Sequence, residues 1–281
     1  MSTISATDVK KLRDQTGAGM MDCKKALTDA GGDFEKAIEE LRKKGQKLSV
    51  KRADREAKEG VVIAKTSQNK NNGVVLRLSC ETDFVAKTES FVELAQSFAD
   101  IALKHLPGSK EELLNLEYQS GITIGLKIEE QTGVIGEKLE LSDYDKIETK
   151  PGEGQVLPYI HMGYRAGVVV ALNREGTAFE EPGKNVAMQI AAMHPIAVDS
   201  EGISSEVIEK EIEIGKEIAR KEGKPEELLE KIATGKLNKF FKENTLLNQA
   251  YVKESKITVE NYLKGIEPEL TVTAFKHIKL G

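Results

Sequence analysis

Two distant stretches of this chain repeat one pattern, an apolar strand followed by an Ala-rich helix. Gly73–Ser79 aligns with Gly167–Asn173, and Leu94–Ala99 then aligns with Val186–Ala191. Short continuous apolar runs are typical of buried strands, and the runs that follow have helical periodicity. The repeat predicts an α+β fold with a duplicated core of two antiparallel-sheet-plus-helix subdomains. A chance match is the alternative, because apolar strands followed by Ala-rich helices are common.

The composition is typical of a soluble globular protein. The chain has 281 residues, 39% hydrophobic and 31% charged, so it is long enough for more than one hydrophobic core. No apolar run reaches the roughly 18 residues that a membrane-spanning helix needs. The start, Met1–Ser5, lacks the basic and apolar regions of a signal peptide. We therefore expect a cytoplasmic protein that contacts no membrane.

The first 45 residues have the apolar spacing of three short helices separated by glycine turns. The turns are Gly17-Ala18-Gly19 and Gly31-Gly32. A unit this small buries little apolar surface, so we expect a compact three-helix module. Met20 and Met21 are adjacent and lie on different sides of their helix. One of the two is expected to face outward, where a flexible thioether suits a partner surface.

A basic stretch follows the module. Between Arg42 and Lys58, eight Lys or Arg residues outnumber two acids, and Gly45 interrupts the apolar periodicity. We interpret residues 46–58 as a solvated basic linker that tethers the module, because no aromatic residue is interleaved for base stacking. The formal net charge of −5 also argues against a dedicated nucleic-acid site. Binding of RNA or the ribosome through this linker remains the alternative.

The rest of the chain divides at glycine and proline clusters into a two-part core and an inserted pair of helices. A predicted hairpin of strands at 60–66 and 73–79 is followed by helices at about 89–105, 109–116 and 122–133 and by a strand within 138–148. These elements form the first subdomain, residues 59–149. The second subdomain takes residues 150–199 and 246–281, with a closing strand at 269–279. Residues 200–245 are expected to form a helical hairpin, because Gly223-Lys224-Pro225 ends one helix and starts the next.

The first repeat carries residues at its strand exit that the second repeat lacks. Thr82, Asp83 and Phe84 follow the strand, whereas Arg174-Glu175-Gly176-Thr177 occupies the matching place in the second repeat. Binding residues are often placed on such corners of a rigid scaffold. The alternative is structural: Thr82 or Asp83 caps the following helix, and Phe84 packs beneath it.

Signatures of enzymatic catalysis are missing from the sequence. The four Gly-Lys pairs lack the spacing of a phosphate-binding loop, and the four histidines lack that of a helical zinc pair. Cys23 and Cys80 are too far apart to indicate a disulfide framework or a metal site. We expect a protein that is not an enzyme, binds no nucleotide directly and holds no metal or cofactor. A hydrolase or transferase that uses Asp83 with a histidine is the remaining alternative.

Two long motifs resemble those of a known family. Val9–Leu27 has Thr-Gly-Ala-Gly-Met-Met-Asp-Cys at its centre, and Cys80–Lys87 reads Cys-Glu-Thr-Asp-Phe-Val-Ala-Lys. The two motifs resemble the bacterial translation elongation factor Ts family, and the likeness extends over essentially the whole chain. The resemblance implies an N-terminal ubiquitin-associated-like helical module, a core of two related α+β subdomains and a coiled-coil arm. Such an arm packs either on its own body or on a second copy, as a homodimer.

The resemblance also implies a function and the residues that perform it. Proteins of this family promote guanine-nucleotide exchange on the GTPase elongation factor Tu. The corner that enters beside the partner's magnesium and phosphate site corresponds to Thr82, Asp83, Phe84 and Val85.

Two further contacts with the partner are implied. The candidates for the module's contact with the partner's nucleotide-binding domain are Leu12, Arg13, Met20 and Met21. His161 is the candidate for a contact of the second subdomain with another partner domain. This chain departs from many relatives beside His161, at Tyr164 and Ala166, so the details of that contact are not carried over.

Overall fold

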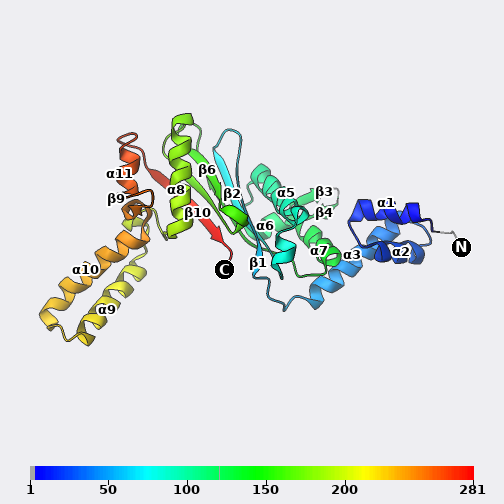
Figure 1. The fold of residues 1–281 in the computed structure, drawn as a ribbon, viewed down its shortest axis with the longest axis horizontal. Coiled ribbons are helices and arrows are strands. Elements are labelled where there is room, and N and C mark those ends of the chain that lie inside the picture. The colour runs from blue at the N-terminus through cyan, green and yellow to red at the C-terminus, as the bar shows by residue number, and fades with distance from the viewer. Residues whose placement is uncertain (1–3, 120) are drawn as a thin grey trace.

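A computed structural model describes residues 4–119 and 121–281 and shows three parts in a row (Figure 1). Three helices lie at the N-terminal end, two sheets with their covering helices form the middle, and two long helices project from the opposite end. The sheets are antiparallel, as the α+β prediction requires. Residues 1–3 lie outside the described residues. They are part of the predicted module and of the Met1–Ser5 segment that was compared with a signal peptide. Within the described ranges, no helix is long and apolar enough to cross a membrane.

Caps and glycines set the bounds of the first three helices, α1 (Ala6–Thr16), α2 (Met20–Asp29) and α3 (Phe34–Lys51). Ser5 begins α1 through a capping box with Asp8, and Gly17 ends it in the left-handed region at a φ of 70°. Asp33 caps α3 by accepting a hydrogen bond from the Lys36 N–H. The three helices, called the helical module below, enclose one small core. Its buried residues are Val9, Leu12, Ala18, Cys23, Ala26, Leu27 and Ala37.

The predicted linker is wrong for residues 46–51, because α3 continues through them to Lys51. Gly45 interrupts the apolar pattern for a packing reason. A Cβ at Gly45 would lie 2.7 Å from the carbonyl oxygen of Glu129, and a Cβ at Gly133 would lie 2.6 Å from the Gly45 Cα. Gly133 belongs to α7 (Ile124–Ile135), a helix of the first subdomain. The two glycines let α3 and α7 cross in close backbone contact, so the module is docked on the body and not merely tethered to it.

The first subdomain is a three-stranded sheet in the order β1-β2-β5, covered on one face by helices. The strands are β1 (Glu59–Thr66), β2 (Asn72–Cys80) and β5 (Glu140–Glu148). The helices are α5 (Glu89–His105), α6 (Lys110–Asn115) and α7, with a small hairpin of β3 (Glu117–Gln119) and β4 (Ile122–Thr123) before α7. Val74, Leu76 and Leu78 of β2 point toward Phe91 and Phe98 of α5, because alternate residues of a strand share one face. The predicted hairpin, helices and strand are confirmed here.

The second subdomain has the same connectivity, a hairpin followed by a helix and a returning strand beside the second strand. Its sheet has the order β10-β7-β6. The strands are β6 (Gln155–Ile160), β7 (Ala166–Leu172) and β10 (Val272–Lys279). The helices on its outer face are α8 (Glu180–Met193) and α11 (Val259–Lys264), with a small hairpin of β8 (Ala250–Tyr251) and β9 (Glu254–Thr258) before α11. The shared connectivity is what the repeated sequence pattern predicts.

The two sheets stack face to face, so the two subdomains form one body with four layers (Figure 1). Val62, Val75 and Val169 lie in the apolar layer between the sheets. Gly73 and Gly167 let the sheets approach closely. A Cβ at Gly73 would lie 2.5 Å from Cγ1 of Val156, and one at Gly167 would lie 2.8 Å from Cγ1 of Val62. This stacking holds the two subdomains in a fixed relation.

The two long helices at the far end are α9 (Ser205–Lys221) and α10 (Glu226–Asn244), and they pack on each other. Gly223, at a φ of 73°, ends the first, and Pro225 precedes the second. The predicted helical hairpin is therefore present. Gly215 in α9 packs against Ala233 in α10, which allows close contact between the two helices.

Candidate functional site

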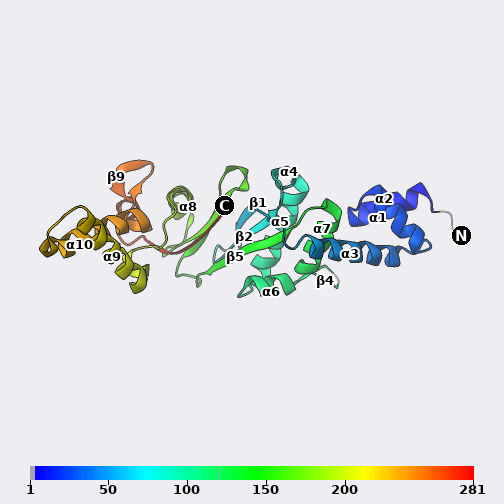
Figure 2. The same cartoon turned by 90° about the horizontal axis from the view of Figure 1, so that it is seen from below.

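The corner after β2 carries the residues singled out from the sequence. β2 ends at Cys80, and a one-turn helix, α4 (Asp83–Ala86), follows at the edge of the body beside β1 and α5 (Figure 2). Burial raises the pKa of the Cys80 thiol to about 12, so this thiol stays protonated and unreactive. The strand that leads to the corner is buried along its length, so the corner is carried by a well-packed element.

Thr82 is fixed by an acid from a distant part of the chain. The Thr82 N–H donates to Oε2 of Glu137 at 3.0 Å, and the Thr82 hydroxyl donates to Oε1 of the same carboxylate at 2.6 Å. Thr82 precedes α4 in extended backbone, but its side chain makes no capping hydrogen bond to that helix. Of the two caps in the structural alternative, Thr82 is therefore wrong, and Asp83 lies within α4 as its first residue.

Asp83 presents a charged carboxylate at the surface. Its Oδ2 lies 2.6 Å from Nζ of Lys87, one helical turn away, and its side chain is about half exposed. The hydrogen bond from Lys87 holds the pKa of Asp83 below its ordinary value. The carboxylate is thus ionised at neutral pH.

Phe84 points away from the protein, with 81% of its surface exposed. The next two residues do the opposite: Val85 packs against the core of the first subdomain, and Ala86 is buried. Burying a Phe side chain stabilises a fold by about 1.5–3 kcal/mol, and Phe84 forgoes that stabilisation. The alternative in which Phe84 packs beneath the next helix is wrong. Phe84 is therefore available for contact with another molecule.

A second acid ties the same corner to the end of α3. Oε1 of Glu81 accepts from the Lys138 backbone N–H at 2.6 Å and from Nη1 of Arg52 at 2.7 Å. These bonds, the backbone one first, lower the pKa of Glu81. Glu137, Glu81 and Arg52 were not singled out from the sequence. Their partners are far away along the chain, and no local pattern could have identified them.

The candidate contact residues of the module differ in exposure. Leu12 is fully buried in the module core, at 0% exposure, so its assignment to the contact face is wrong. Arg13 is exposed at the end of α1. We expected one of Met20 and Met21 to face outward, and both do, at 45% and 76% exposure. An outward face of Arg13, Met20 and Met21 remains.

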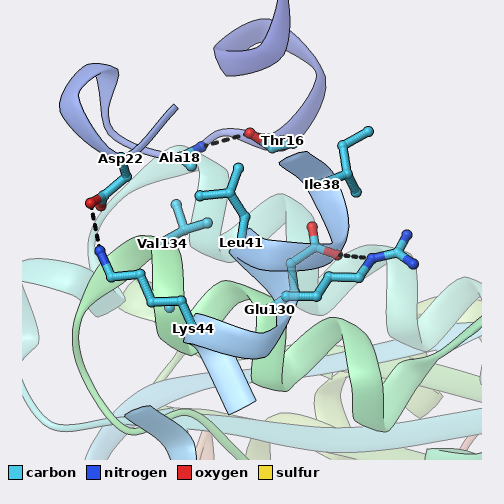
Figure 3. A pocket seen from close by; sticks show the side chains of 10 residues that line it. Thr16, Ala18, Asp22, Ile38, Leu41, Lys44, Glu130 and Val134 are labelled. Carbon is cyan, nitrogen blue, oxygen red and sulfur yellow. Dashed lines mark hydrogen bonds and ion pairs between the residues drawn. The ribbon is translucent and has the colours of Figure 1, made fainter. Parts of the chain in front are cut away.

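The junction between the module and α7 contains a small hollow (Figure 3). Leu41 and Val134 line it from opposite sides, and Lys44 forms an ion pair with Asp22 at 2.5 Å. Arg42 of α3 pairs with Glu130 of α7 at 3.9 Å. The hollow is a seam between packed helices, which supports the docked position of the module.

His161 lies in the loop between β6 and β7, next to a short 3-10 turn, η1 (Met162–Tyr164). It is exposed, and its Nδ1 lies 3.1 Å from the Tyr159 hydroxyl. Met162, which the sequence did not single out, is 86% exposed. Both η1 and α4 contact β1, so the structure brings His161 and the Phe84 corner to the same strand, whereas the module lies at the end of the molecule (Figure 1).

The two residues that depart from many relatives have structural roles. Tyr164 has a left-handed backbone, with a φ of 58°, and its side chain packs against the core of the first subdomain. Ala166 is buried at the start of β7. Tyr164 therefore anchors the His161 loop across the two subdomains.

The histidines do not gather around Asp83. His194 and His277 stack in the second subdomain with ring centroids 5.1 Å apart, and His161 bonds to Tyr159. In the described part of the chain, no group of three or more His, Cys, Asp or Glu side chains is placed to hold a metal ion. Asp83 is a surface carboxylate that pairs with Lys87.

Comparison with known proteins gives one consistent result. The family described as Elongation factor TS matches residues 81–281. The chain is 50% identical to elongation factor Ts of Christiangramia forsetii and 51% identical to that of Flavobacterium psychrophilum, and each match covers 100% of both chains. Elongation factor Ts of Cytophaga hutchinsonii is 50% identical, again over 100% of both chains. The chain therefore belongs to the elongation factor Ts family.

Proposed function

We propose that this protein is a guanine-nucleotide exchange factor for elongation factor Tu, and that the Thr82–Val85 corner promotes release of GDP. The observation that carries the proposal is the exposed Phe84 beside the ionised Asp83, on a turn held by Glu137. Family membership supports the choice of partner.

The corner has the chemistry needed to disturb a bound nucleotide. A GTPase holds its nucleotide through magnesium and through backbone donors around the phosphates. Phe84 would wedge between elements of the partner, and the negative Asp83 would lie near the magnesium and phosphate site. Together they would favour a distorted pocket that holds magnesium poorly and therefore holds GDP weakly.

Linkage gives the direction of the effect. If the factor binds the empty partner more tightly than the nucleotide-loaded partner, then nucleotide must weaken the factor's binding by the same ratio. The factor accelerates exchange without being consumed, and GTP refills the emptied partner. No bond is made or broken by the factor, so the proposed role needs no catalytic group.

Two other surfaces supply binding energy in this proposal. Arg13, Met20 and Met21 of the module would contact the partner's nucleotide-binding domain, and His161 would contact another partner domain. The exposed thioethers support the first contact, because Met side chains adapt to a partner surface. The docked module supports it as well, because a fixed module lets both contacts form at once.

The charges around the basic stretch weigh against the RNA-binding alternative. Five of its eight bases form ion pairs with acids of the same chain, which leaves less positive charge for phosphates. They are Arg42, Lys43, Lys44, Arg52 and Lys58.

Substitution of Phe84 by Ala tests the proposal. We expect Phe84→Ala to lower the maximal rate of factor-promoted release of fluorescent GDP by about thirtyfold or more, because a central aromatic contact is worth about 2 kcal/mol or more. Thermal unfolding should stay at the wild-type temperature, since Phe84 is exposed. Stopped-flow fluorescence with elongation factor Tu measures the rate.

Ile196→Ala is the matched control, because Ile196 is also an exposed apolar residue, at 58%, but lies in the second subdomain after α8. It should leave release at the wild-type rate. Release by Phe84→Ala at the wild-type rate would rule out the wedge. A wild-type protein that does not accelerate release at all would rule out the exchange function.

A further inference from the structure

The end of α7 places a carboxylate against the Phe84 corner. Gly136 ends α7 in the left-handed region, at a φ of 82°, and the next residue, Glu137, turns toward the corner. Its two carboxylate oxygens accept two different donors of Thr82, the backbone N–H and the hydroxyl. Hydrogen bonds to a charged acceptor are stronger than neutral ones, and two bonds to one residue also fix its orientation.

The residues on either side of Thr82 and Phe84 are held as well, Glu81 by Arg52 and Lys138, and Val85 and Ala86 by packing on the core. α4 is a single turn, and a helix this short is not stable by itself. Thr82 is the last residue before that turn, so the direction in which Phe84 points depends on the backbone at Thr82. Glu137 fixes that backbone on the side facing the protein, while Phe84 faces outward.

α7, the helix directly before Glu137, also holds the module in place. α7 crosses α3 at Gly133 and Gly45, and Arg52, which ends α3, bonds to Glu81 directly before Thr82. α7 and the end of α3 thus connect the module to the Phe84 corner. A displacement of α7 relative to β2 would be transmitted to Thr82 through the Glu137 carboxylate.

We propose that Glu137 is a positioning residue for nucleotide exchange, which aims the Phe84 corner by clamping Thr82. This inference rests on the proposed exchange function. Glu137 does not touch the partner in this account. Its removal loosens the corner, so Phe84 enters the partner's site less often, while the module and the His161 loop bind as before.

The test uses Glu137→Gln and Glu137→Ala in the full chain. Gln keeps the size of the side chain but loses its charge and one of its two acceptors, and Ala loses both bonds. Glu148→Gln is the matched control, because Glu148 lies at the end of β5 and pairs with Lys146 at 2.7 Å, away from the corner. Stopped-flow GDP release from elongation factor Tu gives the maximal rate and the half-saturating factor concentration.

We expect the maximal rate to fall about tenfold with Glu137→Ala and less with Glu137→Gln, since a hydrogen bond to a charged group is worth roughly that factor or more. The half-saturating concentration should stay near wild type. A variant that merely misfolds would behave differently, because a smaller folded fraction raises the apparent half-saturating concentration and leaves the maximal rate unchanged.

Hydrogen–deuterium exchange of the free factor supplies a readout without the partner. The Thr82 amide and the amides of α4 should exchange faster in both Glu137 variants, and those of β2 and α5 should not. A double-mutant cycle of Thr82→Val with Glu137→Ala should be non-additive, because both substitutions break the same hydroxyl bond.

Three outcomes would overturn the inference. Unchanged maximal rates in both variants would show that the clamp does not matter for exchange. Lower rates with unchanged deuterium exchange at the corner would show that Glu137 acts by touching the partner. Additive effects of Thr82→Val and Glu137→Ala would show that the two residues act separately. If the proposed exchange function itself is wrong, the wild-type factor will not accelerate GDP release. That result distinguishes its failure from failure of the inference about Glu137.

Discussion

The corner after β2 and the corner after β7 occupy the same place in two subdomains of one topology, but they place an aromatic side chain in opposite ways. Phe84 is 81% exposed, on α4, which begins three residues after the end of β2. Phe179 ends the 3-10 turn η2 (Thr177–Phe179) after β7, and it packs against the core of the second subdomain. The second corner packs its aromatic against its own core, whereas the first leaves its aromatic exposed.

The two corners are also held by different parts of the protein. Thr82 is clamped by Glu137 from the end of α7, the helix that carries the module. At the second corner, Arg174 bonds to Glu267 at 2.8 Å and to Glu269 at 2.7 Å, in the segment before β10 of its own sheet. In this duplicated fold, one corner is therefore held from the neighbouring helix and exposes its aromatic, while the other is held within its own subdomain.

The largest effect on stability within this comparison is expected from Phe179→Ala. Because Phe179 is partly buried, we expect a loss of about 1–3 kcal/mol in the free energy of unfolding. GDP release per folded molecule should stay at the wild-type rate, the reverse of the pattern expected for Phe84→Ala. Urea denaturation and stopped-flow release measure the two quantities. A Phe179→Ala protein that is stable but slow in release would break the contrast between the corners.

The next prediction concerns the crossing of α3 and α7, the helices that hold the first corner but not the second. In Gly133→Ala the new Cβ meets the Gly45 backbone, and overpacking of this kind costs about 1–3 kcal/mol. We expect a loss of stability and a rise in the half-saturating factor concentration, because the module leaves its docked position. Gly235→Ala in α10 is the control. Its Cβ meets nothing within 4 Å, so it should stabilise the protein by a few tenths to about 1 kcal/mol.

A smaller effect, on the pH dependence of stability, is expected from His277 in the second subdomain. Burial, then His194 and then Lys279, lower the pKa of His277 from 6.5 to about 4, so the unfolded chain binds a proton between these values that the folded chain does not. Stability is therefore lost as pH falls from 6.5 toward 4. After allowance for partial exposure, we expect a loss of about 1–2 kcal/mol between pH 7 and pH 5 from this residue.

Urea denaturation of wild type and His277→Phe at pH 7 and pH 5 measures this loss, and the variant should depend less on pH. The first corner should not take part, because the pKa of Asp83 is below its ordinary value and its carboxylate stays ionised over this range. Equal pH dependence in the two proteins would contradict the assignment to His277.

Periodicity and glycine turns were enough to predict the three N-terminal helices, the two repeated units and the helical hairpin. These features depend on neighbours in the sequence. The exit of β2 was also placed correctly, because a continuous apolar run followed by polar residues indicates a surface turn.

The failures have one physical origin, which is contact between residues far apart in the chain. The length of α3 was missed because Gly45 looks like a helix breaker, whereas it allows the crossing with α7. Leu12 was placed on the contact face by resemblance, but its side chain fills the module core. Glu137 was missed because its partner, Thr82, is 55 residues away in the sequence.

The most direct test of the account places a photoreactive phenylalanine analogue, p-benzoylphenylalanine, at position 84 and irradiates the complex with nucleotide-free elongation factor Tu. Position 179 and position 196, both in the second subdomain, serve as controls. The account predicts cross-links from position 84 to partner peptides around the magnesium and phosphate site, and none there from position 179 or 196. Cross-links from position 84 that fall elsewhere on the partner, or that are no more frequent than those from position 179, would contradict it.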